Sequence, residues 1–187
     1  DGTYSVEIPA AGTARVSAFR RAFAPVAADA PAGADPVVDL DMPAFGTIHV
    51  TVAEGGNPAP ARVQVFPTTG TASRPPPEFG ERPVTDGREH VEFAITGDAS
   101  LRVPAGTWRV VVSRGYEYEL EDFPATVVTA GATADVEATL RHSVDTVGEM
   151  CADYHIHTTR SPDSEDDGSL KVAALVADGL EIAIRSE

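Results

Sequence analysis

Cysteine is almost absent from this sequence. Cys151 is the single cysteine among 187 residues, so no disulfide can form within the chain. The fold must therefore rest on packing and hydrogen bonding. Cys151 lies four residues before the first of two nearby histidines, but a buried structural thiol at the start of a strand is the more common role for such a residue.

Positive charge is also scarce. Fourteen lysines and arginines stand against 29 acidic residues, which gives a formal net charge of −15. A chain of this charge repels phosphate backbones, so we predict no nucleic-acid partner. No run of about 18 apolar residues occurs, so we predict no helical membrane span. The chain begins with Asp1 rather than Met, and we expect it to be cut from a longer protein whose oligomeric state the sequence does not indicate.

Short runs of alternating apolar and polar residues fill roughly the first 140 positions, the pattern of antiparallel strands joined by tight turns. The run 46–52 is an example, with His49 predicted to face water. The residues predicted to point inward are Ile48, Val50 and Val52 in this run, Val63 and Val65 in the next, and Trp108, Val110 and Val112 further along.

The same part of the sequence also repeats. Residues 2–16 align with residues 97–110 if one alanine is inserted, and residues 31–40 resemble residues 129–138. We therefore predict the tail of a first β module at 1–43 and a whole β-sandwich at 44–141, with roughly seven strands. A linker is expected at 142–150 and a different segment at 151–187. Residues 68–88, with three prolines in a row, predict an exposed loop.

The runs GTIHVTV, ARVQVFP and VPAGTWRVVVSRGYEYE together resemble the carboxypeptidase-regulatory-like, or transthyretin-like, β-sandwich. The resemblance covers most of residues 44–141 and is carried by a degenerate pattern. It implies an accessory module without common catalytic residues, of the kind found beside secreted or envelope enzymes. An extracellular or cell-envelope location is the expectation that follows.

The segment 151–187 contains the residues that most resemble a site. His155 and His157 are two apart on a predicted strand, so both imidazoles face one side and can reach one metal ion. Asp163 follows in a loop and can fold back as a carboxylate ligand. Next come a predicted helix at 170–178, with Gly179 just beyond its end, and a second strand at 180–184. Strand, helix and strand in this order predict a parallel βαβ unit.

ADYHIHT, SPDS and ADGLEIAI in this order resemble the start of a PHP (polymerase and histidinol phosphatase) metallohydrolase domain. The resemblance implies a mainly β chain whose sandwich modules precede the first β-α-β unit of a truncated PHP-type β/α barrel. It implies His155, His157 and Asp163 as ligands of zinc, manganese or iron ions that activate water against a small phosphoester or other ester. Glu187 and Asp153 are possible further ligands or supporting groups, as is Thr158. Without the later ligands of that family, the fragment itself is expected to be inactive.

Less specific interpretations accompany this one. Two histidines on a strand can be ordinary surface residues, and Asp166 and Asp167 suit the solvated start of a helix. His49, His90 and His142 have no second ligand at a useful spacing. Tyr116, Tyr118 and Phe123 are more typical of strand packing than of a binding patch. The alternative for the whole chain is a non-catalytic β-sandwich module, structural or adhesive, of an envelope or secreted protein.

Overall fold

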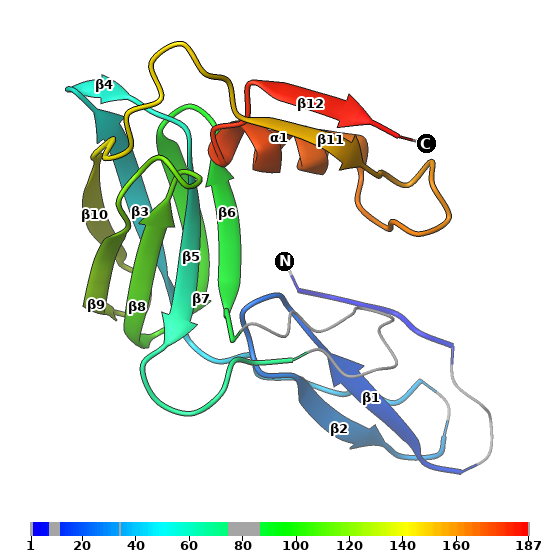
Figure 1. Cartoon of the computed structure of the whole chain (residues 1–187). Helices are drawn as coiled ribbons and strands as arrows, with labels where there is room; N and C mark the ends of the chain where they lie inside the picture. Colours follow the sequence, from blue (N-terminus) through cyan, green and yellow to red (C-terminus); the bar gives the residue numbers. More distant parts are fainter. Residues whose placement is uncertain (1, 8–11, 34, 75–86, 187) are drawn as a thin grey trace.

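The computed structural model describes residues 2–7, 12–33, 35–74 and 87–186. Figure 1 shows a β-sandwich, a small unit with strands β1 and β2 on its N-terminal side, and a unit with β11, α1 and β12 on its C-terminal side. The described chain is therefore mainly β, as the sequence predicts.

Two sheets make up the sandwich. In the first, β3 lies between β10, which runs parallel to it, and β7, which runs antiparallel, and the short β4 pairs with the end of β3. In the second sheet all neighbours are antiparallel in the order β6-β5-β8-β9. The strand bounds are β3 Phe45–Glu54, β4 Asn57–Pro58, β5 Ala61–Pro67, β6 His90–Ala94, β7 Asp98–Pro104, β8 Gly106–Ser113, β9 Glu121–Val128 and β10 Thr133–Leu140.

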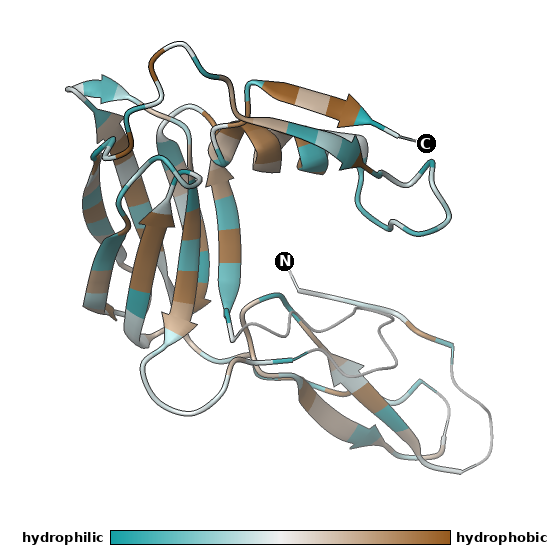
Figure 2. Ribbon diagram, viewed as in Figure 1, coloured by the Kyte–Doolittle hydropathy of each residue, from teal (hydrophilic) through white to brown (hydrophobic). Residues whose placement is uncertain are grey.

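The alternating pattern explains the core. Figure 2 shows bands of apolar and polar residues crossing the strands, because successive side chains on a strand point to opposite faces. The predicted inward residues are confirmed: Ile48, Val50, Val52, Val63, Val65, Trp108, Val110 and Val112 are all buried. The Trp108 indole donates to the carbonyl of Pro104 at 2.8 Å, which satisfies its one polar group.

The N-terminal unit consists of the antiparallel pair β1 (Ala14–Ala18) and β2 (Val26–Ala30). The turn between the two strands carries Phe23, which is only 1% exposed and belongs to the sandwich core. Its ring meets Phe45 edge to face, with 5.9 Å between the ring centroids. The turn thus fastens the small unit to the sandwich.

The C-terminal unit contains β11 (Ala152–Ile156), α1 (Gly168–Ala177) and β12 (Ile182–Arg185), and β12 pairs in parallel with β11. Asp167 caps the helix by accepting from the amide of Ser169, so the helix begins earlier than predicted. Gly179 follows the helix at φ +74°, and the amides of Gly179 and Leu180 donate to the carbonyls of Val176 and Leu175. This is the C-terminal motif that the glycine predicts.

One expectation about the helix needs correction. Val172, Leu175 and Val176 share its predicted apolar face, yet Val172 is 60% exposed and Val176 39% exposed. The buried residue of the helix is Ala177, because α1 contacts β5 and β6 near its C-terminal end.

At ten residues, α1 is also too short to cross a membrane, and no other described helix qualifies. Most of the predicted loop at 68–88 falls outside the described residues, which omit 75–86.

Candidate functional site

His155 and His157 lie at the end of β11 and just after it. Their rings are adjacent, with centroids 4.7 Å apart and planes at 48°. The His155 side chain is exposed, whereas His157 is half-buried. The structure thus brings the two predicted histidines together, as their spacing on an extended chain requires.

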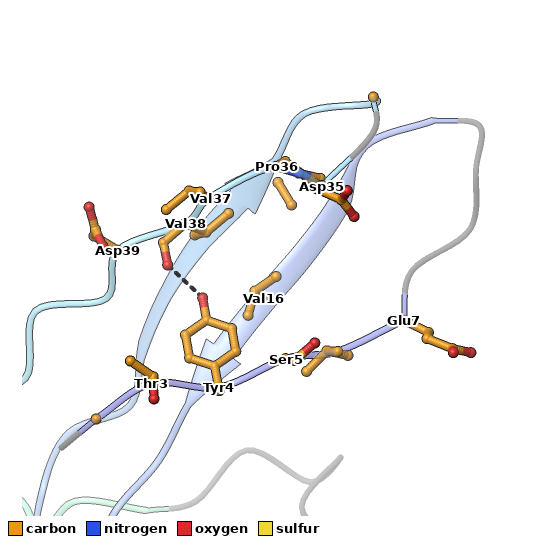
Figure 3. Close-up of a pocket in the computed structure, with 14 residues that line it drawn as sticks. Thr3, Tyr4, Ser5, Glu7, Val16, Asp35, Pro36, Val37, Val38 and Asp39 are labelled. Atoms are coloured by element: carbon orange, nitrogen blue, oxygen red, sulfur yellow. Dashed lines mark hydrogen bonds between the residues drawn. The ribbon is translucent and has the colours of Figure 1, made fainter.

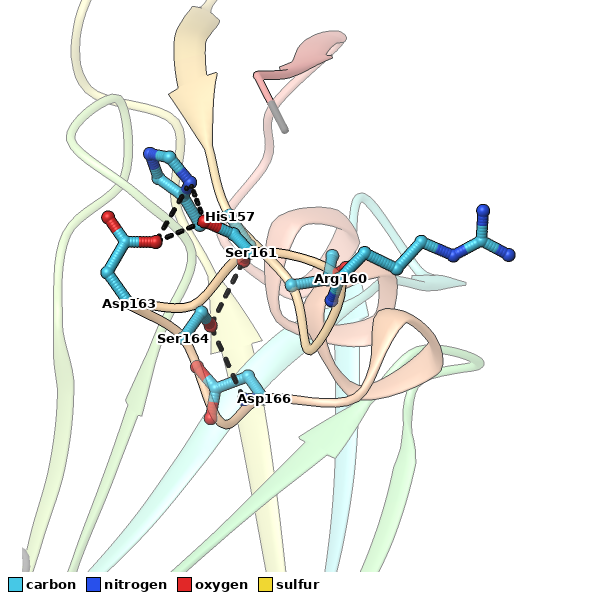
Figure 4. A network of polar contacts seen from close by, with 7 residues as sticks. His157, Arg160, Ser161, Asp163, Ser164 and Asp166 are labelled. Atoms are coloured by element: carbon cyan, nitrogen blue, oxygen red, sulfur yellow. Dashed lines mark hydrogen bonds and ion pairs between the residues drawn. The ribbon is translucent and has the colours of Figure 1, made fainter.

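Asp163 returns to His157 through the loop that follows β11, as Figure 4 shows. Its Oδ1 atom lies 3.3 Å from Nδ1 of His157. Ser161, which is buried, lies between them: its hydroxyl is 2.9 Å from the same Nδ1 and donates to Asp163. The contacts among these three side chains thus hold residue 163 against residue 157 at the start of the loop.

The rest of the loop is held by its own backbone. The amide of Thr159 donates to the carbonyl of Asp166 at 2.9 Å, and the amide of Ser161 donates to the carbonyl of Thr158. The hydroxyl of Ser164 donates to the carbonyl of His157 at 3.3 Å. The loop between β11 and α1 is therefore a compact turn whose polar groups are largely satisfied internally.

The hydrogen bond from Ser161 holds the pKa of the Asp163 carboxyl below its ordinary value, and the nearby His157 and His155 add to the effect. Asp163 is thus an anion at neutral pH. Asp153 has a different task, because its carboxylate accepts the amide of His155 at 2.9 Å. Glu187, the other possible ligand, lies outside the described residues.

The arrangement around His157 differs from that of a nucleophilic triad. In a Ser-His-Asp triad the serine and the carboxylate occupy opposite nitrogens of the imidazole, so that a proton can pass through the ring. Here Ser161 and Asp163 both lie at Nδ1 of His157. The three residues can hold a loop but are not arranged to activate a hydroxyl. Sequence reasoning missed Ser161, although a serine before a proline in a short loop is a common source of such local hydrogen bonds.

A shallow hollow of about 590 Å³ adjoins these residues. Its rim carries the carboxylates of Asp153, Asp163, Glu165 and Asp166. Among the described residues that line the hollow, Lys171 is the one basic residue besides the histidines, and it lies 2.6 Å from Asp166. The hollow is open and acidic, which makes it unsuitable for an anionic phosphoester unless positive charge is added.

No group of three or more His, Cys, Asp and Glu side chains in the described part of the chain is arranged to hold a metal ion. His155, His157 and Asp163 are neighbours in sequence and space without forming such a group. The prediction of a metal-binding hydrolase is therefore wrong on this finding. The ligand roles of the individual residues, and the zinc, manganese or iron cofactor, stay predictions that no ion in the structure tests.

His49 forms a second polar cluster, which the sequence did not predict. On the outer face of β3, its Nε2 lies 2.8 Å from Asp98 of β7 and its Nδ1 lies 3.0 Å from Asp135 of β10. These contacts raise the pKa of His49, first through the hydrogen bond to Asp98 and then through the one to Asp135. The histidine thus links three strands of one sheet.

Comparisons with known proteins identify no family for the chain. No family model matches it, and no curated protein does. Among solved structures, the chain is similar to GBS52, the minor pilin of the gram-positive pathogen Streptococcus agalactiae, with 12% identity and a TM-score of 0.39. The match covers 74% of this chain and 63% of the pilin chain.

These findings correct both resemblances drawn from the sequence. Neither the PHP family nor the carboxypeptidase-regulatory-like family has a model that matches. The described residues after 141 form one two-stranded sheet with one short helix, which does not show the first β-α-β unit of a PHP barrel. The PHP assignment is wrong, and with it the description as a phosphoesterase. The β-sandwich itself is confirmed.

Proposed function

We propose that this chain is a non-catalytic structural module. Its β-sandwich holds the N-terminal unit and the C-terminal unit each in a fixed position. One observation supports this most strongly: each flanking unit is anchored to the sandwich by a buried or half-buried contact. Phe23 is the N-terminal anchor, and the pair Arg62–Asp178 is the C-terminal one.

The N-terminal anchor combines an apolar and a cationic contact. Phe23 is inserted among the core residues of the sandwich. Arg20 lies over the rings of both Phe23 and Phe45, at 5.4 and 5.2 Å from their centroids. A buried aromatic side chain of this kind contributes several kcal/mol, about 3–5 when it is truncated to alanine. Such a contact is strong enough to fix one unit against another.

The C-terminal anchor joins helix α1 to the outer face of β5. Arg62 of β5 forms an ion pair with Asp178, the C-cap residue of α1, and their side chains are 30% and 26% exposed. The chain also comes very close at Gly115, where an added Cβ would lie 2.3 Å from the carbonyl oxygen of Asp178. The close approach and the partly buried pair together favour one orientation of the C-terminal unit.

The polar residues of the C-terminal unit fit this role. His157, Ser161 and Asp163 hold the loop between β11 and α1, and Asp167 caps the helix. Their hydrogen-bonding groups are directed at the chain itself. A module of this type would suit an extracellular or envelope protein, as proposed from the sequence, and the division at 1–43, 44–141, 142–150 and 151–187 is proposed as its domain organisation.

A turnover assay separates this proposal from an enzymatic one. The full chain would be incubated with p-nitrophenyl phosphate and p-nitrophenyl acetate in the presence of Zn²⁺, Mn²⁺ or Fe²⁺, beside the variants His157→Ala and His142→Ala. His142 is an exposed histidine outside the loop and serves as the control. We expect the same background rate for all three proteins. Metal-dependent turnover that is lost in His157→Ala and kept in His142→Ala would overturn the proposal.

A further inference from the structure

Two hollows of the structure each lie within a single unit. One, of about 590 Å³, adjoins the loop after β11. Figure 3 shows the other, of about 720 Å³, where the hydroxyl of Tyr4 donates to the carbonyl of Val38 at 2.6 Å. Among the described residues that line these hollows, none belongs to the sandwich. The contacts that decide how the units are arranged therefore lie elsewhere.

The connection between β8 and β9, residues 114–120, lies between two segments that border the C-terminal unit. On one side it contacts the turn after α1, residues 178–179, and on the other side the linker, residues 141–144. We propose that this connection sets the orientation of the C-terminal unit, with Arg114 and Tyr118 as its positioning residues. This role deepens the proposed function and rests on it.

A second point of attachment is what a fixed orientation requires. The ion pair between Arg62 and Asp178 attaches the C-terminal unit at one point, and a unit attached at one point can still rotate about it. The linker enters the same unit from the other end of the helix and strand pair. A connection that holds both the linker and the end of α1 removes this rotation.

Two glycine turns meet on the side of α1. Gly115 has a φ of +61°, and an added Cβ there would overlap the carbonyl oxygen of Asp178. Gly179 has a φ of +74°, and its added Cβ would lie 3.6 Å from Cγ of Arg114. The backbones of the two turns therefore approach each other directly, and residue 115 leaves no space for a side chain.

Main-chain hydrogen bonds hold the linker on the other side. The carbonyl of Glu117 accepts the amides of Ser143 and Val144 at 2.9 and 3.2 Å. The next residue, Tyr118, forms an antiparallel bridge with His142. The first part of the linker thus runs along the connection in the manner of a short added strand.

Arg114 and Tyr118 join the two sides. The guanidinium carbon of Arg114 lies 5.4 Å from the centroid of the Tyr118 ring, and that ring meets His142 with 4.8 Å between centroids. Both side chains are also tied to the sandwich. Arg114 donates to the carbonyl of Pro60 at 2.7 Å, and the hydroxyl of Tyr118 donates to Glu54 at 3.2 Å. Both are half-buried, which strengthens a contact between a cation and an aromatic ring.

Amide hydrogen exchange in the full chain tests this coupling, because a change on one side of the stack should be felt on the other. We expect Tyr118→Leu to accelerate exchange about tenfold at Leu180, whose amide closes the end of α1. Arg114→Ala should accelerate exchange about tenfold at Ser143 in the linker. Tyr118→Phe keeps the ring and should exchange like the wild type. Tyr116→Leu is the matched control, because Tyr116 is in the same connection but 97% exposed.

Three results would overturn the inference. The first is unchanged exchange at Leu180 in Tyr118→Leu. The second is an equal acceleration by Tyr116→Leu, and the third is an equal acceleration by Tyr118→Phe. Fluorescence of Trp108, the one tryptophan, reports whether the sandwich of each variant is folded. If Tyr118→Leu does not fold, Arg114→Ala decides, and unchanged exchange in its linker would overturn the inference.

Arg62→Ala, measured beside these variants, separates the inference from the proposed function. Acceleration in α1 by Arg62→Ala but not by Tyr118→Leu would remove the role of the connection and leave the anchor between Arg62 and Asp178 in place. Unchanged exchange in Arg62→Ala would instead contradict that anchor.

Discussion

At the scale of single residues, His49 carries the clearest dependence on pH. Both of its ring nitrogens face carboxylates, Asp98 and Asp135, which favour the imidazolium and raise the pKa. Arg102 and Glu137 are further charged residues on the strands beside it, and both are exposed. A raised folded-state pKa means that the stabilisation is complete below the unfolded value of about 6.5 and is lost as the pH rises through the folded value.

We therefore expect the melting temperature of the wild type to fall, relative to that of His49→Gln, as the pH is raised from about 6 to about 9. The comparison with His49→Gln is needed because burial lowers the pKa of His90. The titration of His90 therefore changes the melting temperature of both proteins in the opposite direction. Calorimetry at several pH values measures it. A constant difference across this range would show that folding does not raise the pKa of His49.

Gly46 gives a steric prediction. An added Cβ would lie 2.4 Å from the carbonyl oxygen of Thr129 and 2.7 Å from that of Ala132, and both atoms are backbone. Gly46→Ala should therefore cost about 1–3 kcal/mol of unfolding free energy. Gly131→Ala is the control: no atom lies within 4 Å of its added Cβ, but its φ is +72°, so about 1–2 kcal/mol is expected from backbone strain alone. Urea unfolding followed by Trp108 fluorescence compares the two variants, and a Gly46→Ala variant as stable as the wild type would contradict the predicted clash.

Phe23 gives a prediction about the N-terminal anchor. Because its ring is buried in the core of the sandwich, Phe23→Ala should lower the unfolding free energy seen by Trp108 by about 3–5 kcal/mol. Phe19→Ala, in the same turn but only half-buried, should cost clearly less. Equal losses in the two variants would mean that Phe23 does not anchor the unit.

At the scale of elements, the docking of α1 depends on Arg62. Burial raises the pKa of Asp178, while Arg62 and then Arg88 oppose the shift. Arg62→Ala leaves this carboxylate partly buried without its nearest cation, a situation that costs about 3–5 kcal/mol for fully buried pairs and less here. We expect amide exchange in α1 to accelerate at neutral pH.

The pH dependence of this variant is a further check on the same element. Because the pKa of Asp178 is already raised, the protonated carboxyl is favoured in the docked state, so docking of Arg62→Ala should improve as the pH falls toward about 4. The double variant Arg62→Ala/Asp178→Asn should dock better than Arg62→Ala at neutral pH. If the double variant exchanges as fast as the single one, the uncompensated charge is not the cause.

The elements also show what the sequence could predict. Alternation identifies the sandwich strands and their inward residues, because burial on one face imposes a period of two. Gly179 marks the end of α1, because few other residues accept its φ. The parts that could not be predicted depend on tertiary contacts: which face of α1 is buried, the insertion of Phe23 into the core, and the grouping of His49 with carboxylates from two other strands.

The residues 155–163 show a different limit. Their spacing predicts that they lie close together, and they do. What they do there depends on the groups around them, and Ser161 was the group that sequence reasoning omitted. A short pattern of His, Ser and Asp is compatible with a metal site, a nucleophile or a loop closure, so the pattern alone does not select among them.

At the scale of the whole molecule, the sandwich occupies the middle of the described chain and contacts a unit on each side (Figure 1). A two-stranded sheet and a ten-residue helix are marginal on their own. We therefore expect the C-terminal unit to be ordered mainly through its docking on β5 and β6. The sandwich therefore determines the position and orientation of the C-terminal unit.

The most direct test is a distance measurement by electron spin resonance between spin labels on the sandwich and on α1. Val127→Cys on β9 and Val172→Cys on α1 place the labels at side chains that are 66% and 60% exposed, in a Cys151→Ser background. We predict one narrow distance distribution, which Arg62→Ala broadens at neutral pH. A broad distribution in the protein with Arg62 intact would show that the sandwich does not hold the C-terminal unit, and would contradict the proposed function.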